Sequence, residues 1–334
     1  VGRTYPGLPE KLDTPFKYGK GLDRFHRPLI ELQKDYARDL LTHVNPYTGF
    51  SLAQDPAVVV EINNENSILD AKLDTKAEQL NALPDPYRAD LLDQWQIWLA
   101  KRYASDEALR TSWSRESSDL VTRESAAFPA KGSASSVEMH DFKRFLYETE
   151  YATSAELRQY LKNDLAVASL VLDSQASYGE LAGVYRESKL SDVIDMHSYW
   201  QLQLWTKTPW DLENWKFLNE AMSGDENGGT LNRLGRHRVL GMPFTVSEYN
   251  HPAPSIHALQ ALPMMLSFAS FQDWDGFYQF TYKNDAASWE PDKLTFFHNL
   301  DGNSGQLVFV PFAAIALRTG CFETKTEPIA LELP

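Results

Sequence analysis

The 334-residue chain has a single cysteine, Cys321, which excludes an intrachain disulfide bond. It is also poor in basic residues: 32 Lys and Arg stand against 46 Asp and Glu, and the formal net charge is −14. Nucleic-acid-binding proteins normally present a basic surface, so this charge argues against a nucleic-acid partner. No apolar run reaches the length of a membrane span. We expect Cys321 to be buried as a small apolar side chain.

Patterns that would point to several other functions are missing too. The sequence has no glycine-rich phosphate-binding loop and no internal repeat with a period of about 20–50 residues. It begins at Val1 without a signal-peptide pattern, which suggests a processed protein or a fragment. The composition, 43% apolar and 23% charged, is typical of a globular protein, and the length fits one large α/β domain.

Residues 58–66, with the sequence VVVEINNEN, change abruptly from apolar to polar. The three Val residues and Ile62 predict a buried strand. The run then ends in amides and in the carboxylate of Glu65. Two interpretations follow: Glu65 is a functional acid at the end of a parallel strand, with Asn64 beside it to bind substrate, or the segment is an ordinary polar loop.

Residues 242–252, with the sequence MPFTVSEYNHP, have a similar arrangement. A short apolar strand ends in Glu248 and passes into a loop of polar and aromatic residues. Two carboxylic acids at separate strand ends suit glycoside hydrolysis. One acid protonates the leaving oxygen, and the other attacks or stabilises an oxocarbenium-like carbon.

The pair Asn64-Glu65 at one strand end, with Glu248 three strands later, resembles the retaining glycoside hydrolases of clan A. Members of that clan are (β/α)8 barrels, in which the acid/base Glu follows an Asn at the end of strand four and the nucleophile Glu ends strand seven. The resemblance implies that Glu65 is the acid/base, Asn64 a substrate-binding residue and Glu248 the nucleophile. It also implies that the two carboxyl groups lie about 5 Å apart, the separation of retaining enzymes.

Strands alternate with helices along the chain, which predicts a parallel sheet wrapped by helices. Strands are expected at 57–62, 167–172, 193–200, 243–248 and 276–282. Under the clan A assignment these are strands four to eight of a (β/α)8 TIM-type barrel, so that strands one to three would precede Val1. An open doubly wound sheet explains the strand number equally well but does not explain two acids at strand ends.

We therefore expect a partial barrel domain at 1–320, with a surface excursion at 114–138, and a tail at 321–334 that leads to a further segment. Periodicity predicts the other segments. Residues 1–20 are expected to form a loop, and residues 307–318 a helix or mixed segment. Helices are predicted at 22–43, 87–103, 107–113, 141–162, 180–186 and 255–271, and the helix at 141–162 is expected to break from residue 153. A further helix is predicted after Asp211 and would carry Trp215 and Met222.

Other residues could complete a sugar-binding site. The segment 195–199 (DMHSY) resembles the strand-six exit of the same clan, where a His, often with a Tyr, borders the nucleophile. An imidazole or phenol hydrogen-bonded to Glu248 would keep that carboxylate ionised and correctly aimed. The candidate substrate-binding residues besides Asn64 are His197, Tyr199, Trp200, Tyr249, Trp274 and Tyr282, and Trp205 and Trp210 also follow the third expected strand.

Two alternatives concern individual residues. Asp195 and His197 point to the same face of a strand, a spacing that also suits metal ligands, and His251 could add a third. Without a further cluster of ligands, we expect neither a metal nor a cofactor. Glu61, four residues before Glu65, faces the same side of its strand and is the chief rival for the acid role.

The sequence thus leads to two hypotheses from different classes. The first is a retaining glycoside hydrolase that cleaves a β-linked oligosaccharide or polysaccharide. The second is a non-catalytic carbohydrate-binding or scaffolding barrel. In both, the missing N-terminal part of the barrel would be a further partner.

Overall fold

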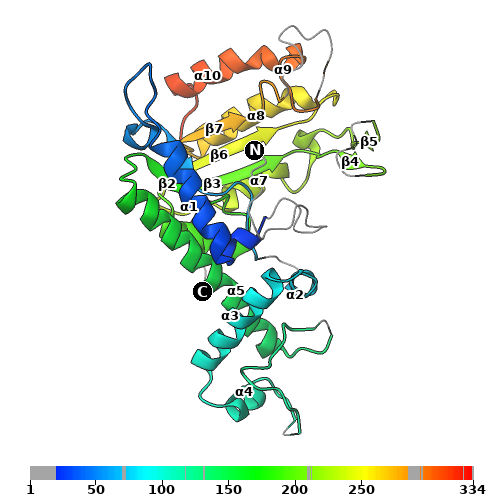
Figure 1. Cartoon of the computed structure of the whole chain (residues 1–334). Helices are drawn as coiled ribbons and strands as arrows, with labels where there is room; N and C mark the ends of the chain where they lie inside the picture. The colour runs from blue at the N-terminus through cyan, green and yellow to red at the C-terminus, as the bar shows by residue number, and fades with distance from the viewer. Residues whose placement is uncertain are drawn as a thin grey trace. The chain divides into compact units, whose positions relative to one another are not determined.

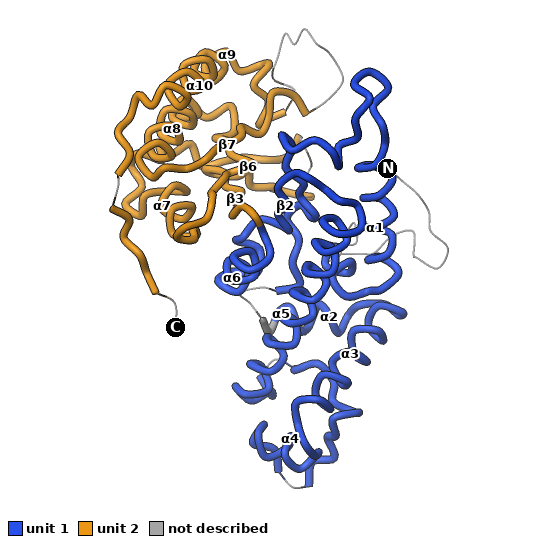
Figure 2. Tube along the Cα trace, turned by 90° about the vertical axis from the view of Figure 1, so that its left-hand side faces the viewer, with its two compact units in different colours: residues 1–191 blue, residues 192–334 orange. Residues whose placement is uncertain are grey.

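The computed structural model describes residues 20–69, 73–116, 118–130, 132–208, 211, 213–284, 294, 296–325 and 327–332, which are coloured in Figure 1. The chain divides into two compact units: unit 1 ends at Ser191, and unit 2 begins at Asp192 (Figure 2). Apart from Lys20, the loop predicted at 1–20 lies outside the described residues. No helix in the described part of the chain is both long and apolar enough to cross a membrane.

Unit 1 contains a two-stranded parallel sheet surrounded by helices. Strand β1 (Val59–Glu61) pairs with β2 (Leu170–Leu172), and the backbone pairing continues past β1 as Asn63 N–H donates to the carbonyl of Asp173. The helical elements are η2 (Leu22–Arg24), α1 (Arg27–Leu41), η3 (Leu52–Gln54), α2 (Leu73–Asn81), α3 (Tyr87–Arg102), α4 (Asp106–Ser112), α5 (Ser136–Gln159), the π-helical turn η4 (Tyr160–Asp164) and α6 (Glu180–Leu190).

The core of unit 1 follows from the four-residue spacing of apolar side chains in α3. Tyr87, Leu91, Trp95 and Leu99 lie on one face of that helix and are buried. The ring of Trp95 packs at 5.2–5.6 Å from two Phe rings of α5. The helix predicted at 87–103 is therefore confirmed. Helix α4 is capped by Ser105, whose hydroxyl accepts the N–H of Ala108.

Unit 2 contains a three-stranded parallel sheet in the order β3-β6-β7, formed by Ile194–Tyr199, Phe244–Asn250 and Gly276–Gln279 (Figure 1). Helix α8 (Ala261–Phe271) packs beside α10 (Phe309–Thr319) and against Phe277 of β7. The remaining elements are the hairpin β4 (Leu204–Trp205) and β5 (Trp215–Lys216), η5 (Met222–Gly224), α7 (Gly229–Arg236), η6 (Ala258–Gln260) and α9 (Ser304–Leu307).

The five parallel strands lie where the sequence predicts them, although four are shorter than expected and β6 runs two residues further. The mixed α/β class is confirmed. The sheets are small, however, and none of those formed by the described residues closes into a barrel.

Three predictions about helices are wrong. Helices α2 and α7 were not predicted. Helix α5 begins at Ser136 and continues without a break to Gln159. The polar residues in its last turns are compatible with a helix because tertiary partners satisfy them: the Thr153 hydroxyl, for example, donates to the carbonyl of Arg24 at 2.6 Å.

Two further corrections concern single residues of unit 2. Instead of lying on a helix after Asp211, Trp215 belongs to strand β5, where it pairs with Trp205 of β4. Cys321 is exposed rather than buried, because it follows the C-cap Gly320 at the end of α10.

Candidate active site

In unit 2, polar side chains line one face of β3. Asp195, His197 and Tyr199 occupy alternate positions, which point to the same side of a strand. On the neighbouring strand β6, the hydroxyl groups of Thr245 and Ser247 donate hydrogen bonds to the two carboxylate oxygens of Asp195, at 2.6 and 2.5 Å. A buried carboxylate is thereby satisfied by two hydroxyl donors, and it ties the two strands together.

Strand β6 carries a bulge at Ser247. Met196 pairs with Val246, whereas the next residue of β3, His197, pairs with Glu248, so Ser247 is an extra residue. The pairing of β6 with β7 shifts at the same place. Because of the extra residue, Glu248 stays on the polar face with Ser247 instead of alternating to the other side. The bulge therefore determines where the carboxylate of Glu248 points.

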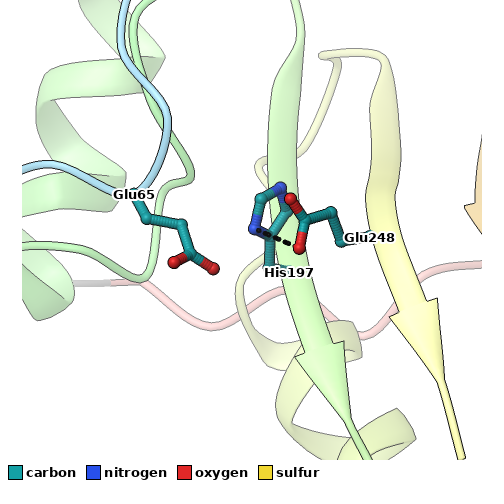
Figure 3. A group of neighbouring side chains, drawn as sticks. All are labelled: Glu65, His197 and Glu248. Atoms are coloured by element: carbon teal, nitrogen blue, oxygen red, sulfur yellow. Dashed lines mark ion pairs between the residues drawn. The ribbon is translucent and has the colours of Figure 1, made fainter. Parts of the chain in front are cut away.

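Two side chains of β3 hold the carboxylate of Glu248. The hydroxyl of Tyr199 donates a hydrogen bond to Glu248 Oε2. His197 Nδ1 lies 3.5 Å from the same oxygen, as the dashed line in Figure 3 marks. The Glu248 side chain is 20% exposed, and that of His197 only 4%. The carboxylate is thus oriented by its neighbours and still reachable from outside.

The hydrogen bonds behind His197 place a hydrogen on its Nε2 atom. The single hydroxyl hydrogen of Ser247 is donated to Asp195, so the Ser247 oxygen accepts the N–H of His197 Nε2, at 2.8 Å. With Nε2 protonated, Nδ1 can offer a hydrogen to Glu248 only if the ring carries both protons. The Nδ1 edge of the ring is therefore the edge that faces the Glu248 carboxylate.

In unit 1, Glu65 lies in the loop that follows β1 (Figure 3). Its backbone has φ 51°, in the left-handed region that non-glycine residues rarely adopt. Its N–H donates to Gln175 Oε1 at 2.7 Å, and its carboxylate is 3.9 Å from Lys20 Nζ. The Glu65 side chain is 28% exposed.

The segment directly after Glu65 is anchored by buried charges. Arg24 donates to the carbonyl of Asn66 at 2.9 Å and makes two hydrogen bonds to Asp173, at 2.8 and 3.0 Å. Glu150 accepts the N–H of Ile68 at 2.7 Å. All of these side chains are buried, and buried charges with several partners hold a loop in one conformation. Glu65 therefore extends from a rigid support.

Arg186 of α6 links the carboxylates of this network. It pairs with Glu150, with Glu187 at 2.7 Å and with Asp173 at 3.2 Å, and its side chain is fully buried. The main-chain N–H of Asp173 donates in turn to Ser191 at 3.1 Å. The end of β2 and the loop after β1 are thus held by one set of charges.

Three of the other predicted site residues lie at accessible positions. Asn64 is exposed in the loop before Glu65. Trp200 follows β3, is partly exposed and donates from Nε1 to the carbonyl of Glu220 at 2.9 Å. Tyr282, three residues after the end of β7, is 56% exposed. Trp210 lies outside the described residues.

The side chains of Tyr249 and Trp274 are buried. Tyr249 follows Glu248 directly, so its side chain points to the opposite face, where it is fully buried and its hydroxyl contacts His251 Nε2 at 2.8 Å. Burial raises the pKa of Tyr249. Trp274 precedes β7, at the opposite end of the strand from its exit, and packs between Phe244 and Phe268. Neither ring is placed to contact a substrate beside Glu248.

The sequence reasoning missed Ser247, Thr245 and His298. Both hydroxyl residues lie in β6 among apolar residues, and polar residues in an apolar strand are the signal that could have identified them. The His298 ring packs against that of Tyr199, with the ring centres 4.6 Å apart and the planes tilted by 38°. Burial lowers its pKa to about 3, so the ring is neutral at ordinary pH.

The three residues considered as metal ligands have other partners within unit 2. Asp195 accepts from Thr245 and Ser247, His197 is bonded to Ser247, and His251 to Tyr249. Burial also lowers the pKa of His251 to about 4. Hydroxyl groups occupy one polar atom of each ring and both oxygens of Asp195.

Comparison with known proteins provides structural neighbours only. No protein-family model matches the sequence, and no curated protein matches it. Three of the similar solved structures are an agarase (16% identity, TM-score 0.54), an exo-beta-agarase (13%, 0.58) and an endo-beta-1,4-mannanase from Thermotoga petrophila (14%, 0.51). They match 90%, 89% and 89% of this chain.

At these identities the likeness shows the fold alone. Over most of its length, the chain has the α/β fold of these glycoside hydrolases. It spans 40%, 39% and 52% of the length of the three structures.

Proposed function

We propose that this chain is a retaining glycoside hydrolase that cleaves a β-linked polysaccharide. In this proposal Glu248 is the nucleophile and Glu65 the general acid/base. Asn64, His197, Tyr199, Trp200 and Tyr282 would contact the sugar or the two acids.

The observation that carries the proposal is the environment of Glu248. Its carboxylate receives the hydroxyl hydrogen of Tyr199 and lies beside His197, whose ring is linked through Ser247 to Asp195. Donors to a carboxylate favour its ionised form, and a nucleophile must be ionised to attack. Because part of the side chain is open to solvent, a sugar can reach it.

The position of each acid supports the proposal separately. Glu248 lies near the C-terminal end of parallel strand β6, and Glu65 lies just after the C-terminal end of parallel strand β1. In (β/α)8 enzymes the catalytic residues come from the C-terminal ends of the strands. Two of the structural neighbours, the exo-beta-agarase and the endo-beta-1,4-mannanase, are named for action on β-linked glycans, and these names motivate the choice of substrate.

The reaction would proceed in two displacements. Glu65, as a carboxylic acid, gives its proton to the glycosidic oxygen while Glu248 attacks the anomeric carbon, and the bond from that carbon to the leaving oxygen breaks. Water then attacks the anomeric carbon of the glycosyl ester, Glu65 takes a proton from the water, and Glu248 is released. Two inversions give net retention. This route needs the two carboxyl groups about 5 Å apart.

A trapping experiment tests both the chemistry and the residue. The purified chain is assayed on agarose, β-1,4-mannan and aryl β-glycosides, and the configuration of the first product is followed by NMR. It is then incubated with a 2-deoxy-2-fluoro aryl β-glycoside, and the modified peptide is identified by mass spectrometry. We expect the β-anomer first and the fluorosugar on Glu248.

Four other outcomes would contradict parts of the proposal. An α-anomer as first product would show an inverting mechanism, and an adduct on another residue would remove Glu248 from the nucleophile role. Binding to a polysaccharide column without any hydrolysis would favour a non-catalytic carbohydrate-binding protein instead. A Glu248→Gln variant that hydrolyses aryl glycosides like the wild type would contradict the proposal as well.

A further inference from the structure

The side-chain amide of Gln175 lies between two glutamates of unit 1. Its Nε2 is 2.6 Å from the carboxylate oxygen of Glu61, and its Oε1 is 2.7 Å from the main-chain nitrogen of Glu65. Gln175 follows β2 and is completely buried. A buried amide that has both ends paired is well fixed in space.

The orientation of this amide follows from its neighbours. An ionised Glu61 can only accept hydrogen bonds, and the main-chain N–H of Glu65 can only donate one. The Gln175 nitrogen must therefore face Glu61, and its oxygen must face Glu65. Glu61 thus acts as the partner that sets the direction of Gln175.

The backbone of Glu65 needs such support. Its φ of 51° lies in the left-handed region, which is strained for a residue with a side chain. The hydrogen bond from its N–H to Gln175, and that from the next N–H, of Asn66, to Ser174 at 3.1 Å, hold the chain there. Both acceptors come from the segment after β2.

We propose that Gln175 is the positioning residue of Glu65, and that Glu61 positions Gln175. This inference rests on the proposed function, in which Glu65 is the acid/base. It also gives Glu61 a role other than that of a rival acid: the Glu61 carboxylate orients the Gln175 amide, which in turn orients the backbone of the catalytic acid.

Exchanging the two side chains tests the proposal directly. In Gln175→Glu two carboxylates face each other, and in Glu61→Gln the acceptor of the Gln175 nitrogen loses its charge. In the double variant Glu61→Gln/Gln175→Glu, the new amide can donate to the new carboxylate, whose other oxygen still accepts the N–H of Glu65. We therefore expect the double variant to recover activity that Gln175→Glu loses.

The readout must report on the acid itself. Aryl β-glycosides with good and poor leaving groups are compared, because only the poor ones need protonation by Glu65. We expect Gln175→Glu to lower kcat/KM at least about tenfold for a poor leaving group and less than about threefold for a good one. A loss of this size is part of the ~10²–10⁴-fold rate enhancement that a general acid provides. The double variant should return to within about threefold of the wild type.

Gln159→Glu is the matched control, since it makes the same chemical change at an exposed position at the end of α5. Glu65→Gln is run in parallel. If Glu65→Gln shows no dependence on the leaving group, the proposed function fails. If Glu65→Gln shows that dependence but Gln175→Glu matches the wild type, or the double variant is no better than Gln175→Glu, the positioning role of Gln175 is wrong while the function stands.

Discussion

Tyr199 and Glu248 are joined across two parallel strands: the phenol hydroxyl of Tyr199, at the end of β3, donates to the carboxylate of Glu248 on β6. They are not directly opposite in the sheet, since Tyr199 pairs with Asn250 and Glu248 with His197. The diagonal contact leaves His197 beside the same carboxylate oxygen. A phenol and an imidazole thus converge on one acid.

Removing the phenol hydroxyl should weaken the attack by Glu248. In Tyr199→Phe the ring remains and the hydrogen bond is lost, and a bond to a charged group is worth about 1.5–3 kcal/mol. We expect kcat/KM to fall roughly tenfold to a hundredfold for good and poor aryl leaving groups alike, because attack on the anomeric carbon is common to both. Tyr47→Phe makes the same change at a 95% exposed position of unit 1, is the control and should keep wild-type kinetics.

The hydroxyl of Ser247 should matter because it connects His197 to Asp195. Ser247→Ala removes the acceptor of the His197 Nε2–H and one donor to a buried carboxylate. We expect steady-state assays to show a lower kcat for Ser247→Ala, whereas Ser247→Thr, which keeps the hydroxyl, retains most of the activity. Equal activity of the Ala variant and the wild type would mean that this connection does not support Glu248.

Acid should destabilise the protein partly through His298. Its pKa is lowered to about 3 in the folded chain by burial, against about 6.5 for an unfolded His. The stabilising effect of the neutral ring is therefore complete above about pH 6.5 and is lost as the pH falls towards 3. In urea unfolding, His298→Phe should lose less stability than the wild type over that range, by up to about 1.4 kcal/mol per pH unit.

A Phe ring should fit at position 298, because the site is already lined by aromatic rings. The ring centres within 6.2 Å of His298 are those of Tyr199, Phe280, Phe296 and Phe297. His43→Phe, at an exposed position, is the control and should follow the wild-type pH dependence. Parallel curves for His298→Phe and the wild type would show that His298 is not the group that titrates.

The charge network of unit 1 should be costly to interrupt. Arg186→Met leaves Glu150, Glu187 and Asp173 without a shared cation, and breaking a buried ion pair typically costs 3–5 kcal/mol. We expect a loss of about that size in the free energy of unfolding, measured in urea. Arg144→Met removes an exposed pair with Glu148 and should cost less than about 1 kcal/mol. Similar losses for both variants would contradict the importance of burial.

The sequence predicted the five parallel strands well because each is a short apolar run that ends in polar residues. Alternation also placed Asp195 and His197 on one face of β3, as the hydrogen bonds of that face now show. The prediction of a helix after Asp211 was wrong, because the seven-residue spacing of Trp215 and Met222 matches a helical period without forming a helix. In the structure these residues belong to a hairpin strand and a 3-10 turn.

Side-chain direction near the site could not be predicted, because it depends on pairing between strands. The bulge at Ser247 arises from the register of β6 against both neighbours, which no local pattern reveals. The role of Gln175 depends on contacts with residues more than a hundred positions away, at Glu61 and Glu65. Such contacts are set by the tertiary fold.

The bulge at Ser247 also has a consequence for tracing the ancestry of this chain. An ancestor or relative with a regular strand at this place would have one residue fewer between Val246 and its acid. A correct alignment would then need a single-residue gap in the middle of β6, where strands are usually aligned without gaps. An ungapped alignment of this strand would pair Glu248 with the wrong residue, and the homologue would be missed.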